Sequence, residues 1–193
     1  MATSCSRRMP PWLIAAILLG ACGAHPANAA PDQQGKGSSR DGSHDFDFEF
    51  GSWKTHIRRL PLPLTGSTDW VDYDGTSVVR PIWKGRANLG ELDVAGLAGR
   101  ITGLSLRLYD PAARQWRISW ANAANGLLTV PPMVGGFTNG RGLFHDQEQL
   151  GDRTILARFI FSDIRPNSFH LEQAFSADGG KSWETNWISD FRR

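Results

Sequence analysis

The sequence predicts an all-β protein, a single antiparallel up-and-down β-barrel of about ten strands. Apolar side chains alternate along several short segments, turn residues separate these segments, and no segment has the period of an amphipathic helix. Strands that follow one another as hairpins favour a meander, and closing the sheet removes its exposed edges. We therefore expect a barrel rather than a sandwich.

Residues 153–191 give the clearest signal, three consecutive strands with turns at Pro166-Asn167-Ser168 and Asp178-Gly179-Gly180. Matching the apolar faces predicts four cross-strand pairs: Phe161 with Phe169, Phe159 with Leu171, Phe175 with Trp183, and Leu171 with Trp187. The same register places Arg158, Glu172 and Asn186 in a polar row on the other face.

Upstream, Phe46, Phe48 and Phe50 alternate with acids and run into a first strand that contains Trp53 and Ile57. Residues 70–73 and 76–83 predict a hairpin turning at Asp74-Gly75. Residues 87–94 predict a further strand, and 137–147 a glycine-punctuated one. Segments 101–109 and 115–122 predict a hairpin with three apolar pairs: Leu108 with Trp116, Leu106 with Ile118, and Leu104 with Trp120. That register sets Arg107 opposite Arg117, a like-charge pair that needs relief from an acid such as Glu91 or attracts an anion.

The first thirty residues predict an export signal. Arg7 and Arg8 precede a short apolar run, and Ala27-Asn28-Ala29 offers a cleavage site near residue 30. We expect a signal peptide over 1–30, a flexible tether over 31–43 and a barrel domain over 44–193, in a periplasmic or secreted protein.

A lipid anchor is the alternative, because Leu19-Gly20-Ala21-Cys22 resembles a lipobox and would make the protein an envelope lipoprotein anchored through Cys22. The apolar run is too short to span a bilayer, which takes about 20 residues. Removal of the signal also removes both cysteines, Cys5 and Cys22, so no disulfide or cysteine metal site is expected.

The net charge of +2 comes from the signal, because without Arg7 and Arg8 the 21 basic residues become 19 against 19 acidic ones. A neutral mature chain gives no basic patch for nucleic acid. The oligomeric state stays open.

Two short motifs and one longer pattern resemble known families. Gly51-Ser52-Trp53 resembles the Gly-x-Trp signature of calycins, the lipocalin and fatty-acid-binding barrels. The segment 176–183 resembles the Asp-box of sialidases and other propellers, a structural turn, but its single copy does not indicate a propeller. Three longer segments, 45–53, 75–81 and 172–187, are similar to a bacterial exported family of unknown function. That resemblance implies a calycin-like barrel and no established activity.

No metal, cofactor or nucleophilic triad is expected, because the histidines lack metal-ligand spacing and there is no Gly-x-Ser-x-Gly elbow. A haem barrel related to nitrobindin, with His145 or His170 as axial ligand, is a remote alternative.

The candidate ligand-binding residues form two sets, one on each face of the last strands. The first set would line a cavity if the odd-numbered face points inward: Trp120, Phe159, Gln173, Thr185 and Trp187. The second set, Arg158, Glu172 and Asn186, would be the site if the faces are reversed.

Three functions are compatible with these residues. The first is a binding barrel for a small, largely apolar ligand, whose cavity would combine aromatic walls with a few polar groups. The second is an enzyme that uses Glu172 with Arg158, and the third is an envelope interaction protein with a filled barrel.

Overall fold

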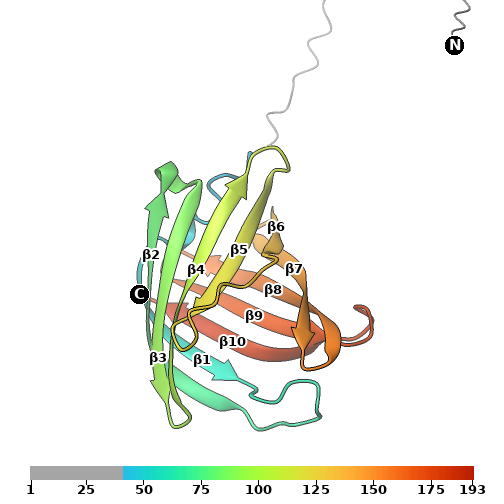
Figure 1. Ribbon diagram of the computed structural model, residues 1–193. Helices are drawn as coiled ribbons and strands as arrows, with labels where there is room; N and C mark the ends of the chain where they lie inside the picture. Colours follow the sequence, from blue (N-terminus) through green and yellow to red (C-terminus); the bar gives the residue numbers. More distant parts are fainter. Residues whose placement is uncertain (1–40) are drawn as a thin grey trace, which may run out of the picture. The chain divides into compact units, whose positions relative to one another are not determined.

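The computed structural model describes residues 41–193, which form one closed barrel of ten antiparallel strands (Figure 1). Each strand pairs with its neighbours in sequence, and β1 closes the barrel against β10, so the predicted up-and-down barrel is confirmed. Within residues 41–193 no helix is long and apolar enough to cross a membrane. The strands are β1 (Gly51–Arg59), β2 (Val71–Ile82), β3 (Ala87–Gly96), β4 (Gly99–Asp110), β5 (Gln115–Asn122), β6 (Met133–Thr138), β7 (Arg141–Leu150), β8 (Arg153–Arg165), β9 (Ser168–Ser176) and β10 (Glu184–Arg192).

The predicted signal, residues 1–30, lies outside the described residues, as do Cys22 and most of the tether. The last tether residues, 41–43, are described and contact the barrel. The Trp116 Nε1–H donates to the carbonyl of Gly42 at 2.9 Å, and the Tyr109 hydroxyl donates to the carbonyl of Asp41.

The N-terminal segment closes one end of the barrel. Its phenylalanine-rich part forms the short 3-10 helix η1 (Asp47–Glu49) instead of a strand. Phe46 is fully buried and meets the rings of Trp116 and Phe161 edge-on. We call this end of the barrel the closed end. The opposite end, where β1 ends, is called the open end.

The tryptophan of the Gly-x-Trp motif connects that segment to the last residue of the chain. The Trp53 Nε1–H donates to the carbonyl of Glu49 at 2.7 Å, and the Arg193 guanidinium lies 4.0 Å from the Trp53 ring centroid. Arg193 also donates to the carbonyl of Phe50 at 2.5 Å. The N-terminal segment and the C-terminus are thereby tied together at the closed end.

The predicted turn at Asp74-Gly75 is wrong, because β2 runs unbroken through it. A Cβ atom at position 75 would lie 2.1 Å from the carbonyl oxygen of Asp93. The glycine therefore permits a close approach of β2 to β3 and not a chain reversal.

The predicted single strand over 137–147 is instead the β6–β7 hairpin. Asn139 and Gly140 both have positive φ angles, 51° and 74°, as a two-residue hairpin turn requires. η2 (Trp83–Gly85) joins β2 to β3.

The β4–β5 register differs from the prediction by one residue, which exchanges the two faces of β4. Arg107 lies opposite Ile118 and points inward, while Arg117 pairs with Asp110 outside at 2.9 Å. The predicted Arg107–Arg117 pair therefore does not exist. The three leucines of β4 that were expected in the core are half-buried on the outer face: Leu104, Leu106 and Leu108.

The β8–β9 register is shifted from the prediction by two residues, which preserves its faces, and the β9–β10 register is shifted by one residue before a bulge in β10 and by two after it. Phe161 lies opposite Leu171 and Phe159 opposite Gln173, because β8 and β9 extend to a two-residue turn with an irregularity before it. Between β9 and β10, a bulge at Asn186 inserts one extra residue. Leu171 consequently faces Ser189, and Phe175 faces Glu184.

Candidate ligand-binding site

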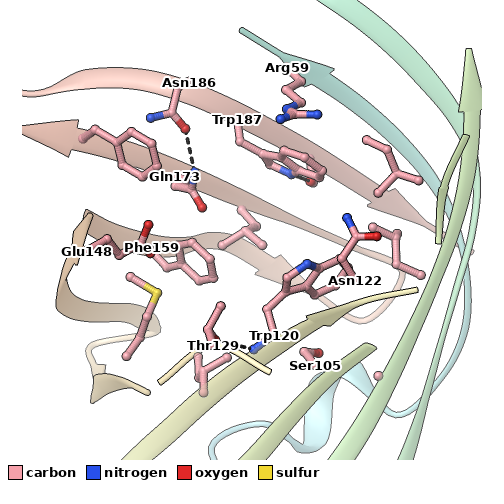
Figure 2. Close-up of a pocket in the computed structure, with 18 of the residues that line it drawn as sticks. Arg59, Ser105, Trp120, Asn122, Thr129, Glu148, Phe159, Gln173, Asn186 and Trp187 are labelled. Atoms are coloured by element: carbon pink, nitrogen blue, oxygen red, sulfur yellow. Dashed lines mark hydrogen bonds between the residues drawn. The ribbon is translucent and has the colours of Figure 1, made fainter. Parts of the chain in front are cut away.

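The open half of the barrel contains a cavity of about 440 Å³ (Figure 2). Its walls come from most of the strands and from the segments that follow β1 and β5. The larger apolar and aromatic residues that line it are Leu60, Leu92, Ile101, Ile118, Trp120, Met133, Leu150, Phe159, Phe161, Leu171, Phe175, Trp187 and Phe191. The polar ones include Arg59, Ser77, Ser105, Arg107, Asn122, Thr129, Asp146, Glu148, Gln173, Asn186 and Ser189.

Two tryptophans and a phenylalanine point toward the middle of this space (Figure 2). Trp120 has room because residue 103 is glycine, where a Cβ atom would lie 2.4 Å from the Trp120 ring. The Trp187 indole N–H donates to the Ser189 hydroxyl at 2.7 Å, which fixes its ring. Together with Phe159 they offer flat apolar surfaces for a ligand.

An amide pair stands at one wall of the cavity. The Gln173 Nε2–H donates to the Asn186 Oδ1 at 2.7 Å (Figure 2). Asn186 reaches the interior because the bulge turns its side chain inward, and it is only 3 % exposed. Its Nδ2 has no hydrogen-bond partner among residues 41–193. A buried amide donor of this kind is satisfied by an ordered water or by an acceptor on a bound molecule.

Two carboxylates, Asp146 and Glu148, occupy successive inward positions of β7. Burial, reinforced by the neighbouring Glu148, raises the pKa of Asp146 to about 7. Burial also raises the pKa of Glu148. No cation of the described chain forms an ion pair with either, so no neighbouring positive charge favours their ionised forms.

A buried ion pair lies below the cavity, toward the closed end. The Arg107 guanidinium is 2.5 Å from a Glu49 carboxylate oxygen and donates to the Asn88 Oδ1 at 3.0 Å. Glu49 is 1 % exposed, and burial raises its pKa to about 7 despite the arginine beside it. Position 90 is glycine, where a Cβ atom would lie 3.4 Å from the Arg107 Nη1. This pair forms a polar floor beneath the aromatic walls.

The structure brings five of the eight predicted site residues together at the cavity: Trp120, Phe159, Gln173, Asn186 and Trp187. Three do not line it: Thr185, Arg158 and Glu172. The predicted polar row is absent, since Arg158 lies opposite Ala174 while Glu172 lies opposite Ile160 and Ile188. The bulge separates Asn186 from the other two by turning it inward.

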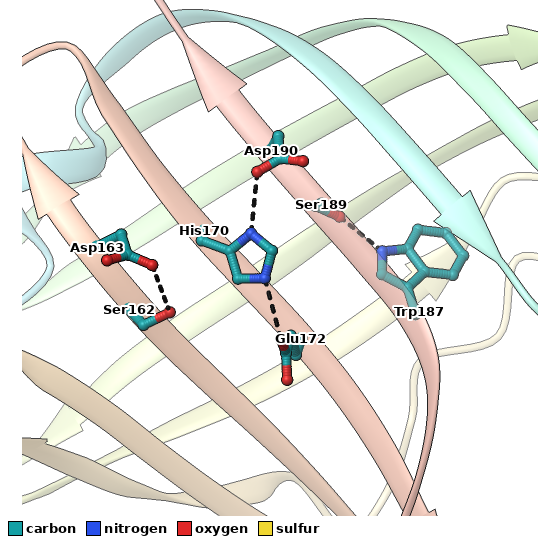
Figure 3. Close-up of polar contacts among 7 residues, drawn as sticks. All are labelled: Ser162, Asp163, His170, Glu172, Trp187, Ser189 and Asp190. Carbon is teal, nitrogen blue, oxygen red and sulfur yellow. Dashed lines mark hydrogen bonds and ion pairs between the residues drawn. The ribbon is translucent and has the colours of Figure 1, made fainter.

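The outer face holds the remaining candidates. The Arg158 guanidinium stacks over Trp183 at 4.3 Å from the ring centroid. His170 lies between two acids, with Nδ1 2.9 Å from Asp190 and Nε2 3.2 Å from Glu172 (Figure 3). His145 is on the outer face of β7, so neither His145 nor His170 faces the cavity as a haem ligand would have to.

Sequence reasoning missed the charged lining residues. Asp146 and Glu148 fall in a polar stretch of β7 that has little apolar alternation, and Arg107 was placed on the wrong face. Asp146 and Glu148 follow the inward Phe144 at intervals of two residues, so all three share one face of the strand. This spacing was the signal available in the sequence.

The Asp-box forms the β9–β10 turn. The Asp178 carboxylate accepts from the backbone N–H and hydroxyl of Ser182 at 2.9 and 2.6 Å, and from the Ser176 hydroxyl at 2.8 Å. The Trp183 indole N–H donates to the carbonyl of Gly180 at 3.1 Å. These contacts hold the loop, and Asp178 does not line the cavity.

Comparison with known proteins identifies similar structures and no family. No family model and no curated protein matches the sequence. Among solved structures, the S-type phycobiliprotein lyase CPES from Guillardia theta has a TM-score of 0.52 at 13% identity, over 77% of this chain and 89% of that one.

Two further barrels are less similar. A de novo designed fluorescence-activating β-barrel has a TM-score of 0.42 at 13% identity, over 78% of this chain and 97% of that one. EF1p2_mFAP2b bound to DFHBI has a TM-score of 0.43 at 11% identity, over 79% of this chain and 98% of that one.

At these identities the likeness concerns the fold alone, which is that of a calycin-like up-and-down barrel. The expected calycin resemblance therefore holds for the fold. None of the comparisons supports the bacterial family of unknown function.

Proposed function

We propose that this protein is an exported barrel that binds a small, largely apolar molecule in its cavity. The observation that carries the proposal is the pairing of aromatic walls with a buried amide, Asn186, whose donor is unpartnered within residues 41–193. Small-molecule sites combine such walls with a few placed polar groups, in volumes of roughly 300–1,000 Å³. The cavity of about 440 Å³ falls in that range.

The open end offers a route for an apolar ligand. Exposed apolar side chains lie in three of its loops: Leu62 after β1, Leu97 after β3, and Leu127 and Val130 after β5. The opposite end is filled by Phe46 and its aromatic neighbours. Entry therefore belongs to the open end.

The two alternatives have weaker support. The enzyme alternative requires Glu172 and Arg158 to act together, and these residues have separate partners, His170 and Trp183, away from the cavity. The filled-barrel alternative requires a packed interior, and the open half contains the cavity.

The test is binding of a neutral naphthalene probe, 2-(1-naphthyl)ethanol, measured by isothermal titration calorimetry. We expect saturable binding that Leu171→Trp weakens at least tenfold, because Leu171 lines the cavity and the larger ring would fill it. Leu143→Trp is the matched control, since Leu143 is exposed on the outer face of β7. The proposal is overturned if neither this alcohol nor its amine analogue, 2-(1-naphthyl)ethylamine, binds, or if both variants bind the alcohol as the wild type does.

Export is part of the same proposal and rests on the signal-like residues 1–30. Intact-mass measurement of the protein from its native host should give an N-terminus at Ala30 or Pro31. A lipidated species beginning at Cys22 would favour the envelope-lipoprotein alternative.

A further inference from the structure

The two cavity carboxylates lie where no neighbouring strand provides a charge for them. Asp146 and Glu148 are separated by about 6.5–7 Å along β7, the spacing of residues two apart on one face of a strand. Their partners on β8 are Ala157 and Ile155, both apolar. On the β6 side, pairing with β7 ends at His145, so Asp146 and Glu148 have no paired residue there.

The two arginines that line the cavity either have another partner or lie in another part of the barrel. Arg107 lies at the floor and is bound to Glu49 at 2.5 Å. Arg59 is at the last position of β1, at the mouth, and its guanidinium lies over the Trp187 ring at 6.0 Å. Within the described chain, the Asp146 Oδ1 is buried and has no hydrogen-bond partner.

Burying a charged carboxylate without a partner costs free energy, and a bound cation reduces that cost. The raised pKa values of Asp146 and Glu148 agree with this, because burial disfavours their charged forms. Asn186 is a second and independent unsatisfied group in the same cavity, a donor on a side chain that is only 3 % exposed.

We propose that Asp146 and Glu148 bind a protonated amine, so that the ligand is an amine with an apolar body. This deepens the proposed function and rests on it. The body lies between Trp120 and Trp187, the ammonium donates to the two carboxylates, and the Asn186 amide donates to an acceptor on the ligand. Charge-assisted hydrogen bonds to carboxylates are stronger than neutral ones, which gives the amine its preference over an uncharged analogue.

The experiment compares two probes of nearly equal shape, 2-(1-naphthyl)ethylamine and 2-(1-naphthyl)ethanol, by calorimetry at pH 8. An alkyl amine is largely protonated there, as lysine is with a pKa of about 10.4. We expect the amine to bind at least tenfold more tightly than the alcohol. In the double variant Asp146→Asn/Glu148→Gln this preference should vanish, while the Kd of the alcohol stays within twofold.

Asp152→Asn is the control, because Asp152 is exposed in the β7–β8 turn and its loss changes net charge without touching the cavity. It should keep the preference. The single variants Asp146→Asn and Glu148→Gln serve if the double variant does not fold, as judged by circular dichroism.

The outcomes separate the two proposals. If the alcohol binds and the amine binds no more tightly, the amine inference is overturned and the proposed function stands. If neither probe binds, both are overturned. If the preference survives loss of both carboxylates, the amine is recognised elsewhere and this site assignment is wrong.

Discussion

The two halves of the barrel place their inward carboxylates in different surroundings. In the closed half, Glu49 and Arg107 form an ion pair at 2.5 Å beneath a cluster of interlocking aromatic rings. In the open half, Asp146 and Glu148 line the cavity, and no cation of the described residues forms an ion pair with either.

The difference shows how one sheet can separate the residues that stabilise the fold from those that bind a ligand. A pair whose charges meet inside the protein is costly to break, because removing one partner leaves the other charge buried and uncompensated. Asp146 and Glu148 have no cation paired with them within the described residues, so their charges cost free energy until a ligand supplies one. Substitutions in the closed half should therefore change mainly stability, and substitutions in the open half mainly ligand binding.

The largest expected effect is in the closed half. Glu49→Ala should lower the free energy of unfolding by about 3–5 kcal/mol, because it leaves the Arg107 charge buried and arginine does not neutralise. Glu91→Ala is the control, since Glu91 pairs with Arg80 at the exposed surface at 2.6 Å and should cost less than about 1 kcal/mol. Urea denaturation measures both, and equal losses would refute the role of burial.

Aromatic truncation should also distinguish the halves. Phe46→Ala removes a fully buried ring and should cost about 3–5 kcal/mol. Phe159→Ala should cost clearly less, because Phe159 borders existing cavity space, but it should weaken binding of the naphthyl alcohol. Thermal unfolding measures the two stability losses, and calorimetric titration measures binding of the naphthyl alcohol. A larger stability loss for Phe159→Ala than for Phe46→Ala would contradict the comparison.

Asp146→Asn should increase stability at pH 8 by roughly 1–2 kcal/mol, allowing for partial solvent screening. The sign follows from the raised folded-state pKa of about 7, against a usual value of 3.8. The stabilising effect of holding the proton is complete below pH 3.8 and is lost as the pH rises through 7. The gain should shrink toward pH 5, and a gain that does not depend on pH would point to another cause.

Asp178→Ala should lower the melting temperature by a few degrees and leave probe affinity unchanged, because the carboxylate holds the β9–β10 turn away from the cavity. Hydrogen bonds from Ser182 hold the pKa of Asp178 at about 2. Its contribution is therefore present above about pH 4 and is lost as the pH falls through 2. A melting temperature equal to that of the wild type at pH 7 would remove its structural role.

The smallest effect is expected on the outer face, for His170→Gln. Partial burial lowers the pKa of His170, but hydrogen bonds to Asp190 and Glu172 outweigh it and raise the pKa above 6.5. The contribution is then complete below pH 6.5 and is lost as the pH rises through the higher folded-state value. The variant should be slightly less stable than the wild type at pH 6 and equal to it at pH 9, which melting curves at the two pH values would test.

The barrel could be predicted from the chain alone, because alternation and turn residues are local signals. The same signal made Trp120, Phe159 and Trp187 candidates for the lining, but it left open which face of the last strands points inward. The Gly-x-Trp motif and the Asp-box were recognisable because each depends on a few residues adjacent in the chain.

The registers, and with them the polar part of the site, depend on contacts that form only in the folded barrel. The faces of β4 were exchanged by a contact distant in sequence, since Arg107 turns inward to meet Glu49. The bulge at Asn186 adds one residue to β10, which no alternation pattern shows in advance. Because one extra residue changes the face of a side chain, such long-range contacts and bulges decide which polar groups reach the cavity.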